Sequence, residues 1–182
     1  MPWLLLLLTL VACGKRPVEA PPAPLDRAAV YPLIVPAQDV PTGPVRRRLV
    51  DGLVIVLAED QHGQAKVLRE PDLQGWPLDD AYTAALANLD RAAHDIPVKA
   101  EVGADGRTVD VVWGHDWRAA ACLLLPGVRQ MAAQKLPAPV YAAIPNRDVL
   151  VLFHDRSLID QILAAEPNRL TDQVIAVDAL EH

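Results

Sequence analysis

The chain has 182 residues, of which 52% are hydrophobic and 4% aromatic, and its formal net charge is −6. This length suits one folded domain with a terminal extension, and the hydrophobic fraction is sufficient for a core built from Leu, Val, Ile and Ala. The mild acidity and the lack of a dense basic face argue against a nucleic-acid partner. The only basic run, Arg46–Arg48, is too short for a polybasic membrane patch and is predicted to be a solvated loop before a strand.

The N-terminus carries a short apolar run, Trp3–Ala12, that ends at Cys13. A membrane-spanning helix needs ~20 apolar residues, so this run is predicted to be the hydrophobic part of a signal peptide. Leu10-Val11-Ala12-Cys13 resembles the lipobox of bacterial lipoproteins, in which the preceding peptide is removed and the cysteine thiol is acylated. The resemblance implies that residues 1–12 are a lipoprotein signal peptide and that Cys13 carries the acyl chains, palmitate among them.

The lipobox also implies a location at the bacterial cell envelope, with the lipid on Cys13 as the membrane partner. Gly14 follows the cysteine, and in Gram-negative lipoproteins this pattern resembles outer-membrane sorting. An ordinary secretory signal, a buried N-terminal strand and a soluble protein without lipid are the alternatives.

A proline-rich tether is predicted over residues 13–26. Four prolines lie between positions 17 and 24, and such a segment forms an extended, solvated spacer of ~3.1 Å per residue where it adopts polyproline II. A single folded domain is therefore predicted over residues 27–182.

The first half of this domain reads as an edge strand, a hairpin and a helix. Pro32 breaks the apolar segment 29–35, which indicates an edge strand or an extended lead-in. The run 49–58 predicts one central strand, followed by a turn at 61–64 and a hairpin partner at 65–70. A helix is predicted from Pro77 until Pro97, with one apolar face made by Tyr82, Ala85, Leu86, Leu89 and Ala93.

The second half alternates irregularly between strands and helices. An Asp-Gly hairpin signal separates strands at 98–102 and 108–113. Asp116 reads as the N-cap of a second helix over 117–125, interrupted by Pro126 and resuming to Lys135. Further strands are predicted at 140–144, 149–153 and 174–177, and a third helix at 157–165. This order predicts an α+β fold: a mixed, largely antiparallel sheet with about three flanking helices.

Five short motifs occur in order along the domain: Tyr31–Pro36, Asp51–Val56, Ala85–Leu89, Asp116–Pro126 and Ala143–Leu150. Together they resemble the bacterial YtpQ-like family, a domain of unknown function, over roughly residues 29–178. The resemblance implies a single α+β domain and supplies no catalytic residues.

Three His-Asp dipeptides are candidate metal ligands: His94-Asp95, His115-Asp116 and His154-Asp155. Imidazole and carboxylate ligands suit divalent metals and the hydrolysis that such metals assist. However, no His-x-x-x-His or His-Glu-x-x-His spacing occurs, and each dipeptide lies at an element boundary where Asp is favoured as a cap. We therefore expect no metal and no cofactor, and keep a metal-assisted hydrolase as the alternative function.

The loop Asn146, Arg147 and Asp148 is the candidate polar binding site. Arg147 is suited to hold a carboxylate or phosphate through paired hydrogen bonds. The alternative is a β-turn in which Arg147 pairs with a neighbouring acid. Cys122, the only other thiol, lies among apolar residues and is predicted to be buried.

No catalytic residue emerges from these patterns. The chain contains neither a Gly-x-Gly-x-x-Gly motif nor a P-loop, and Ser157 is its only serine. The leading hypothesis is a membrane-tethered envelope lipoprotein with a non-catalytic binding or interaction domain, so an enzyme is not expected.

Overall fold

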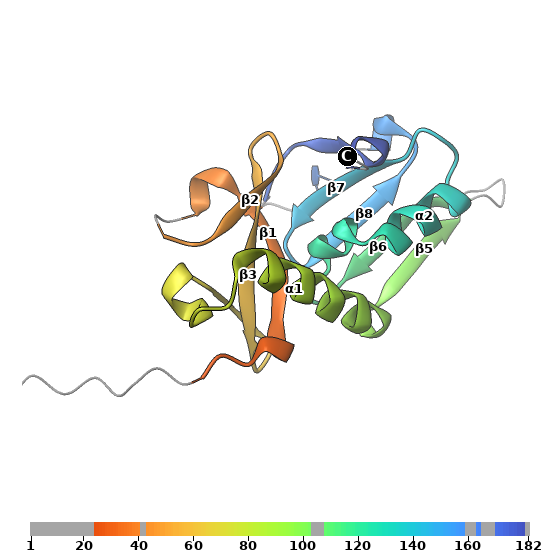
Figure 1. Ribbon diagram of the computed structural model, residues 1–182. Helices are drawn as coiled ribbons and strands as arrows, with labels where there is room; N and C mark the ends of the chain where they lie inside the picture. Colours follow the sequence, from red (N-terminus) through yellow and green to blue (C-terminus); the bar gives the residue numbers. More distant parts are fainter. Residues whose placement is uncertain (1–23, 41–42, 103–107, 159–162, 165–169, 181–182) are drawn as a thin grey trace, which may run out of the picture.

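A computed structural model of the chain describes residues 24–40, 43–102, 108–158, 163–164 and 170–180. Two antiparallel β-sheets lie side by side, and helices pack across them (Figure 1). The predicted signal peptide, Cys13 and most of the predicted tether lie outside the described residues.

The first sheet is organised around one long central strand. Its strands are β1 (Val30–Pro36), β2 (Arg46–Val50), β3 (Leu53–Gln61) and β4 (Gln64–Val67). β3 pairs antiparallel with β1 along one side and with β2 and β4 along the other. The prolines of β1 are compatible with its edge position, because they have no N–H to donate to a further strand.

The region 46–61 corrects two sequence predictions. The single strand expected over 49–58 is a hairpin, because the chain turns at Asp51 and Gly52 between β2 and β3. Gly52 has a φ of +77°, a conformation that only glycine adopts at low cost. The basic run Arg46–Arg48 lies within β2 and not in a loop.

The second sheet has five antiparallel strands in the order β5-β6-β8-β7-β9. These are β5 (Val98–Val102), β6 (Thr108–Gly114), β7 (Tyr141–Asn146), β8 (Val149–Phe153) and β9 (Val174–Ala176). β5 and β9 form the two edges. The strands predicted at 98–102 and 149–153 are confirmed with the same bounds.

The α+β class is confirmed, with two antiparallel sheets, but the described residues contain two bounded α-helices and not about three. These are α1 (Leu78–Ala92) and α2 (Pro126–Lys135). At the third predicted helix, 157–165, the described start Arg156–Leu158 is a 3-10 turn and Leu163 and Ala164 are helical. The other residues of that segment lie outside the described ranges.

The second predicted helix is also corrected. Residues 117–125 form turns and a 3-10 helix, Ala120–Leu124, and Pro126 begins α2 where an interruption was expected. Proline fits the first position of a helix because the N–H it lacks would have no partner there.

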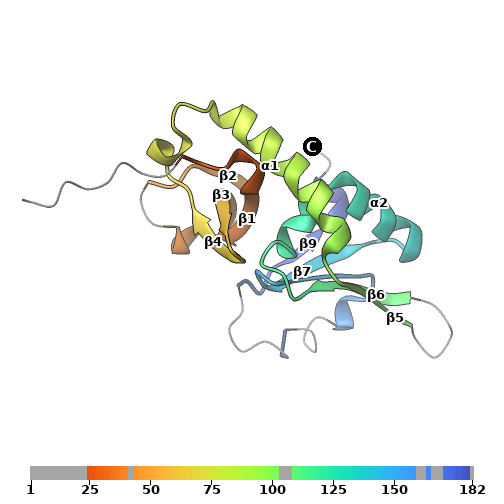
Figure 2. The ribbon, with the colours of Figure 1, turned by 90° about the horizontal axis from the view of Figure 1, so that it is seen from below.

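One hydrophobic core joins the two sheets. Ile34 of β1 and Leu53 of β3 pack in the same cluster as Leu89 of α1, Leu123 of the 3-10 helix and Leu152 of β8. Figure 2 shows α1 running from the first sheet towards the second. Among the described residues, no helix is both long and apolar enough to cross a membrane.

The first described residues already belong to this fold. A 3-10 turn begins at Arg27, and the Asp26 carboxylate caps it by accepting the N–H of Ala28 at 3.0 Å. Leu25 packs against a second core cluster that contains Leu57 and Trp76. The folded domain thus includes Leu25 and Asp26, two residues before the predicted domain boundary at residue 27.

Candidate functional site

The structure does not bring the three His-Asp dipeptides together. His115 follows β6 and His154 follows β8, and these strands run antiparallel with Gly114 opposite Val149 and Asp110 opposite Phe153. The two histidines therefore lie at opposite ends of the strand pair. His94 lies in a 3-10 turn after α1. Within the described residues, no three His, Cys, Asp or Glu side chains are grouped as a metal site.

Two of the dipeptide aspartates have structural partners. Asp116 accepts the backbone N–H and the Nε–H of Arg118, each at 2.8 Å, and the Arg118 guanidinium lies 4.9 Å from the ring centroid of Tyr31. Burial opposes ionisation of Asp116, but the hydrogen bonds from Arg118 outweigh it and lower its pKa. Asp155 accepts the N–H of Ser157 at 2.9 Å.

The polar loop forms the turn between β7 and β8. The Asp148 N–H donates to Asn146 Oδ1 at 2.8 Å, and Arg147 Nε donates to Asp148 Oδ1 at 3.2 Å. Arg147 also borders an apolar groove on the first sheet, beside Leu33 and Val56. These contacts fit the turn interpretation, and ligand binding by the loop stays a prediction.

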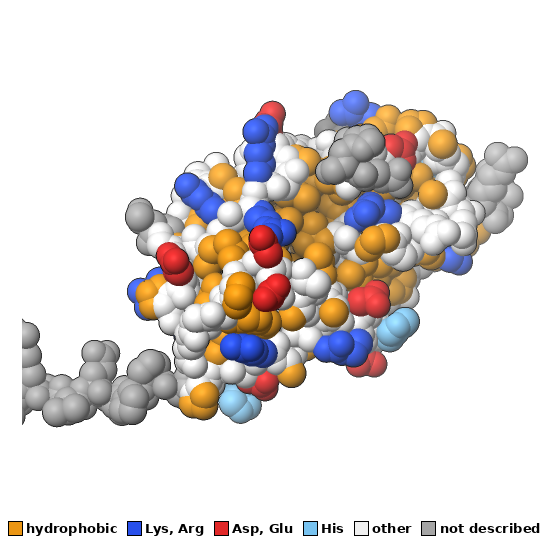
Figure 3. Space-filling model, viewed as in Figure 1, with side chains coloured by type: hydrophobic (Ala, Val, Ile, Leu, Met, Phe, Trp, Pro, Cys, Tyr) orange, Lys and Arg blue, Asp and Glu red, His pale blue; other side chains and the backbone are white. Residues whose placement is uncertain are grey.

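A different site opens where the first sheet meets the helices. This cleft has a volume of about 260 Å³, and Figure 3 shows hydrophobic side chains in the middle of the face onto which it opens, with both basic and acidic side chains among and around them. None of its ten lining residues is acidic. They are Pro32, Arg47, Arg48, Leu49, Ile55, Tyr82, Leu86, Leu124, Arg129 and Leu180. We call it the arginine cleft.

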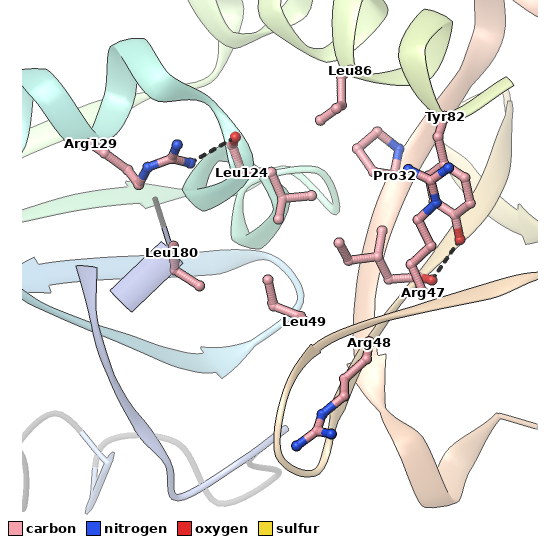
Figure 4. Close-up of a pocket in the computed structure, with 10 residues that line it drawn as sticks. Pro32, Arg47, Arg48, Leu49, Tyr82, Leu86, Leu124, Arg129 and Leu180 are labelled. Carbon is pink, nitrogen blue, oxygen red and sulfur yellow. Dashed lines mark hydrogen bonds between the residues drawn. The ribbon is translucent and has the colours of Figure 1, made fainter. Parts of the chain in front are cut away.

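Leucines from four separate parts of the chain form the apolar part of the arginine cleft. Figure 4 shows Leu86 of α1, Leu124 of the 3-10 helix and Leu49 of β2 directed towards the same space. Leu180 of the last 3-10 turn, Val177–Leu180, completes this group. Leu86 lies on the predicted apolar face of α1, yet 36% of its surface is exposed because it borders the cleft.

Two of the three cleft arginines are paired with carboxylates. Arg47 forms an ion pair with Asp79, and its guanidinium lies 4.2 Å from the ring centroid of Tyr82. Arg48 forms an ion pair with Asp51. Both pairs are largely exposed to solvent, so they contribute little to stability and leave the arginines adjustable.

Arg129, in the first turn of α2, forms no ion pair with any residue that the structure describes. Its Nη1 donates to the carbonyl oxygens of Leu123 and Leu124, at 3.1 and 2.9 Å. Its Nε is buried and makes no hydrogen bond, and no carboxylate of the described residues lies in ion-pair range. Among the described residues, the cleft thus holds a guanidinium without an ion-pair partner beside a leucine surface, and the acidic residue Asp178 lines a neighbouring hollow together with Arg129.

Tyr82 and Cys122 are not arranged for proton transfer or nucleophilic attack. The Tyr82 hydroxyl donates to the Ile55 carbonyl at 2.9 Å, and burial raises its pKa to about 12 despite the nearby Arg47. Burial likewise raises the pKa of Cys122 to about 12. The prediction that Cys122 is buried is confirmed.

Sequence reasoning did not single out the cleft arginines. Arg47 and Arg48 were assigned to a loop, and Arg129 lies in a helix with no recognisable motif. The structure adds that Leu86 and Leu124 are large apolar residues that the core does not fully cover, which the apolar pattern of the sequence could not distinguish from core positions.

Comparison of the chain with protein families, curated proteins and solved structures gave no match. The resemblance to the YtpQ-like family therefore stays a prediction from five short motifs.

Proposed function

We propose that the chain is a non-catalytic binding module whose arginine cleft takes a small amphipathic anion. The observation that carries the proposal is Arg129, a guanidinium with a buried, unused Nε and no carboxylate partner among the described residues. A carboxylate, sulfonate or phosphate can accept from this guanidinium while an alkyl or aryl group packs on Leu86, Leu124 and Leu180.

Binding is favoured over catalysis by the chemistry of the lining. The cleft presents arginines, leucines, prolines and one tyrosine, and none of these provides a base or nucleophile near neutral pH. The metal-assisted hydrolase would need ligands that converge, and the described residues do not bring the His-Asp dipeptides together.

The proposal places this module at the bacterial cell envelope, at the outer membrane, through the lipid on Cys13. The proline-rich tether over 13–26 would hold the domain away from the membrane surface. The YtpQ-like identity of the domain belongs to the same proposal. The supports are the lipobox pattern, the short apolar run and the order of the five motifs.

Two fluorescent probes of matched size separate the anionic from the apolar contribution. We expect the purified full chain to bind 8-anilinonaphthalene-1-sulfonate, an aromatic anion, and Arg129→Gln to weaken that binding about tenfold or more. Binding of N-phenyl-1-naphthylamine, which has no charge, should change little in this variant.

Arg156→Gln is the matched control, because it removes an exposed arginine that lies outside the cleft. An equal loss of affinity for both probes in Arg129→Gln would mean that the arginine only supports the fold. Equal affinity of parent and variant for the sulfonate would reject the cleft as the anion site.

A further inference from the structure

The exposed edge of the second sheet carries features that the binding cleft does not use. All five residues of β5 are exposed, and Figures 1 and 2 both show this strand at the outside of the sheet. Val98 and Val102 are 48% and 60% exposed, the highest values for large hydrophobic side chains in the described residues. An edge strand also presents unpaired backbone N–H and C=O groups to any strand that approaches it.

The orientation of β5 follows from one hydrogen bond at its start. The Gly114 N–H donates to the Pro97 carbonyl at 3.2 Å, so the backbone carbonyl of residue 97 points towards β6. Backbone groups alternate along an antiparallel strand, so those of Lys99 face β6 and those of Val98 and Ala100 point away from the sheet. Side chains alternate too: Val98 borders a groove beside α2, and Lys99 and Glu101 project from the opposite face.

Among the described residues, the acidic charges on this face have no ion-pair partner. Glu101 lies directly opposite Asp110 of β6, and like charges in this position destabilise a strand pair. Oδ1 of Asp110 is buried and has no hydrogen-bond partner among the described residues. Burial, and then the charge of Glu101, raise the pKa of Asp110. Lys99 forms no ion pair with any residue that the structure describes.

We propose that β5 pairs antiparallel with β5 of a second copy of the chain, around a two-fold axis at Ala100. In this register, Lys99 of each copy lies opposite Glu101 of the other, and Val98 lies opposite Val102. The two Lys99–Glu101 ion pairs then neutralise the Glu101 carboxylate of each copy beside Asp110, and the two five-stranded sheets become one continuous sheet.

The charge pattern selects this register over its neighbours. A shift that centres the axis on Lys99 places the two lysines opposite each other, and one that centres it on Glu101 does the same with the two glutamates. A lone lysine on an edge strand normally discourages pairing, but Glu101 makes this strand complementary to itself. The interface is short, so the dimer is expected to be weak in solution.

Charge reversal tests the register as well as the contact. The purified full chain is examined by sedimentation equilibrium in density-matched detergent across the micromolar range. We expect concentration-dependent dimers for the parent, and a dissociation constant raised about tenfold in Lys99→Glu and in Glu101→Lys. The double variant K99E/E101K should dimerise like the parent, because each ion pair is restored with its charges exchanged.

Mixing the two single variants is the sharpest measurement, because a mixed pair restores both ion pairs while each variant alone opposes like charges. Lys66→Glu is the matched control: it makes the same change on β4, an edge strand of the first sheet.

Ala100→Pro should also abolish the dimer, because it removes an N–H that points away from the sheet. Thermal unfolding of each variant checks that its fold is retained.

A parent that stays monomeric across this range overturns the proposal. So does a dimer that withstands both single reversals, or one that the double variant and the mixture fail to restore. Sulfonate binding in the arginine cleft is measured on the same variants and is expected to be unchanged, so this inference and the proposed ligand site fail independently.

Discussion

Asn88 of α1 donates from its side-chain amide to the backbone carbonyl oxygen of Val30 at 2.8 Å, and also to that of Arg27 at 2.9 Å. Asn88 is the one buried polar side chain among the described residues, and only 6% of it is exposed. These hydrogen bonds therefore link α1 to the start of β1 and to the turn before it. Asparagine is otherwise a poor choice inside a helix, and these two bonds explain its presence.

Replacing Asn88 should destabilise the fold without touching the cleft. We expect Asn88→Ala to lower the free energy of unfolding by about 1–3 kcal/mol, because it leaves two carbonyl groups without their partner. Thr83→Ala is the control, since Thr83 lies on the exposed side of the same helix. Urea unfolding measures both, and a loss no larger than that of the control would contradict the role assigned to Asn88.

Removal of the predicted acylation site should prevent lipid attachment. With Cys13→Ser, metabolic labelling with radioactive palmitate should fall to background, and the precursor should keep residues 1–12. Cys122→Ser is the matched control, because that thiol is buried in the fold and should not affect labelling. Equal labelling of the Cys13 variant and the parent would reject the lipoprotein interpretation.

Cys122 should be almost inert in the folded chain. Its side chain is fully buried, and burial raises its pKa to about 12, so little thiolate is present at pH 8. Mass spectrometry of the peptide that contains Cys122 should show slow alkylation by iodoacetamide in buffer and fast alkylation in denaturant. Similar rates in both conditions would show that the 3-10 helix opens readily.

Elements with a strong local signal could be predicted from the sequence, and the turns hidden in apolar runs could not. Pro77 and the periodic leucines and alanines of α1 identify the start of that helix to within one residue, whereas its end lies at Ala92, where a 3-10 turn, Ala93–Asp95, replaces the last predicted turn. Asp51 and Gly52 were missed because β-branched residues surround them, so the two strands looked like one. Residues 117–124 favour helix locally, but they form turns followed by the 3-10 helix Ala120–Leu124, which is packed in the core shared by both sheets.

The arginine cleft depends on tertiary contacts that periodicity does not encode. Arg47 comes from β2 of the first sheet, and Arg129 comes from α2, which lies between β6 and β7 in the chain. Their meeting requires the two sheets to share one core, which is a property of the fold as a whole. The His-Asp dipeptides, by contrast, stood out in the sequence and are separated by the topology.

Asp116 should stabilise the fold in a pH-dependent way. Its pKa is lowered in the folded chain, so its contribution is present above the unfolded value near 3.8 and is lost as the pH falls through the folded pKa. Asp116→Asn should therefore lower the stability at pH 7, and the difference from the parent should shrink below about pH 4. Urea unfolding at several pH values measures it, and a constant difference would contradict the ion pair with Arg118.

Asp110 should give the opposite pH dependence of stability. Burial and the charge of Glu101 raise its pKa in the folded chain, so the folded state favours the protonated acid. Stability from this group is then present below the unfolded pKa and is lost as the pH rises through the folded pKa. Asp110→Asn, which keeps the shape and removes the charge, should stabilise the fold at pH 7 and have little effect at pH 3.

The unfolding measurement is made at a protein concentration where the chain is monomeric, because a second copy would bring Lys99 close to Glu101 and Asp110. A destabilised variant at neutral pH would mean that ionised Asp110 has a cationic partner outside the described residues, and the charge argument for the β5 edge would lose one of its supports.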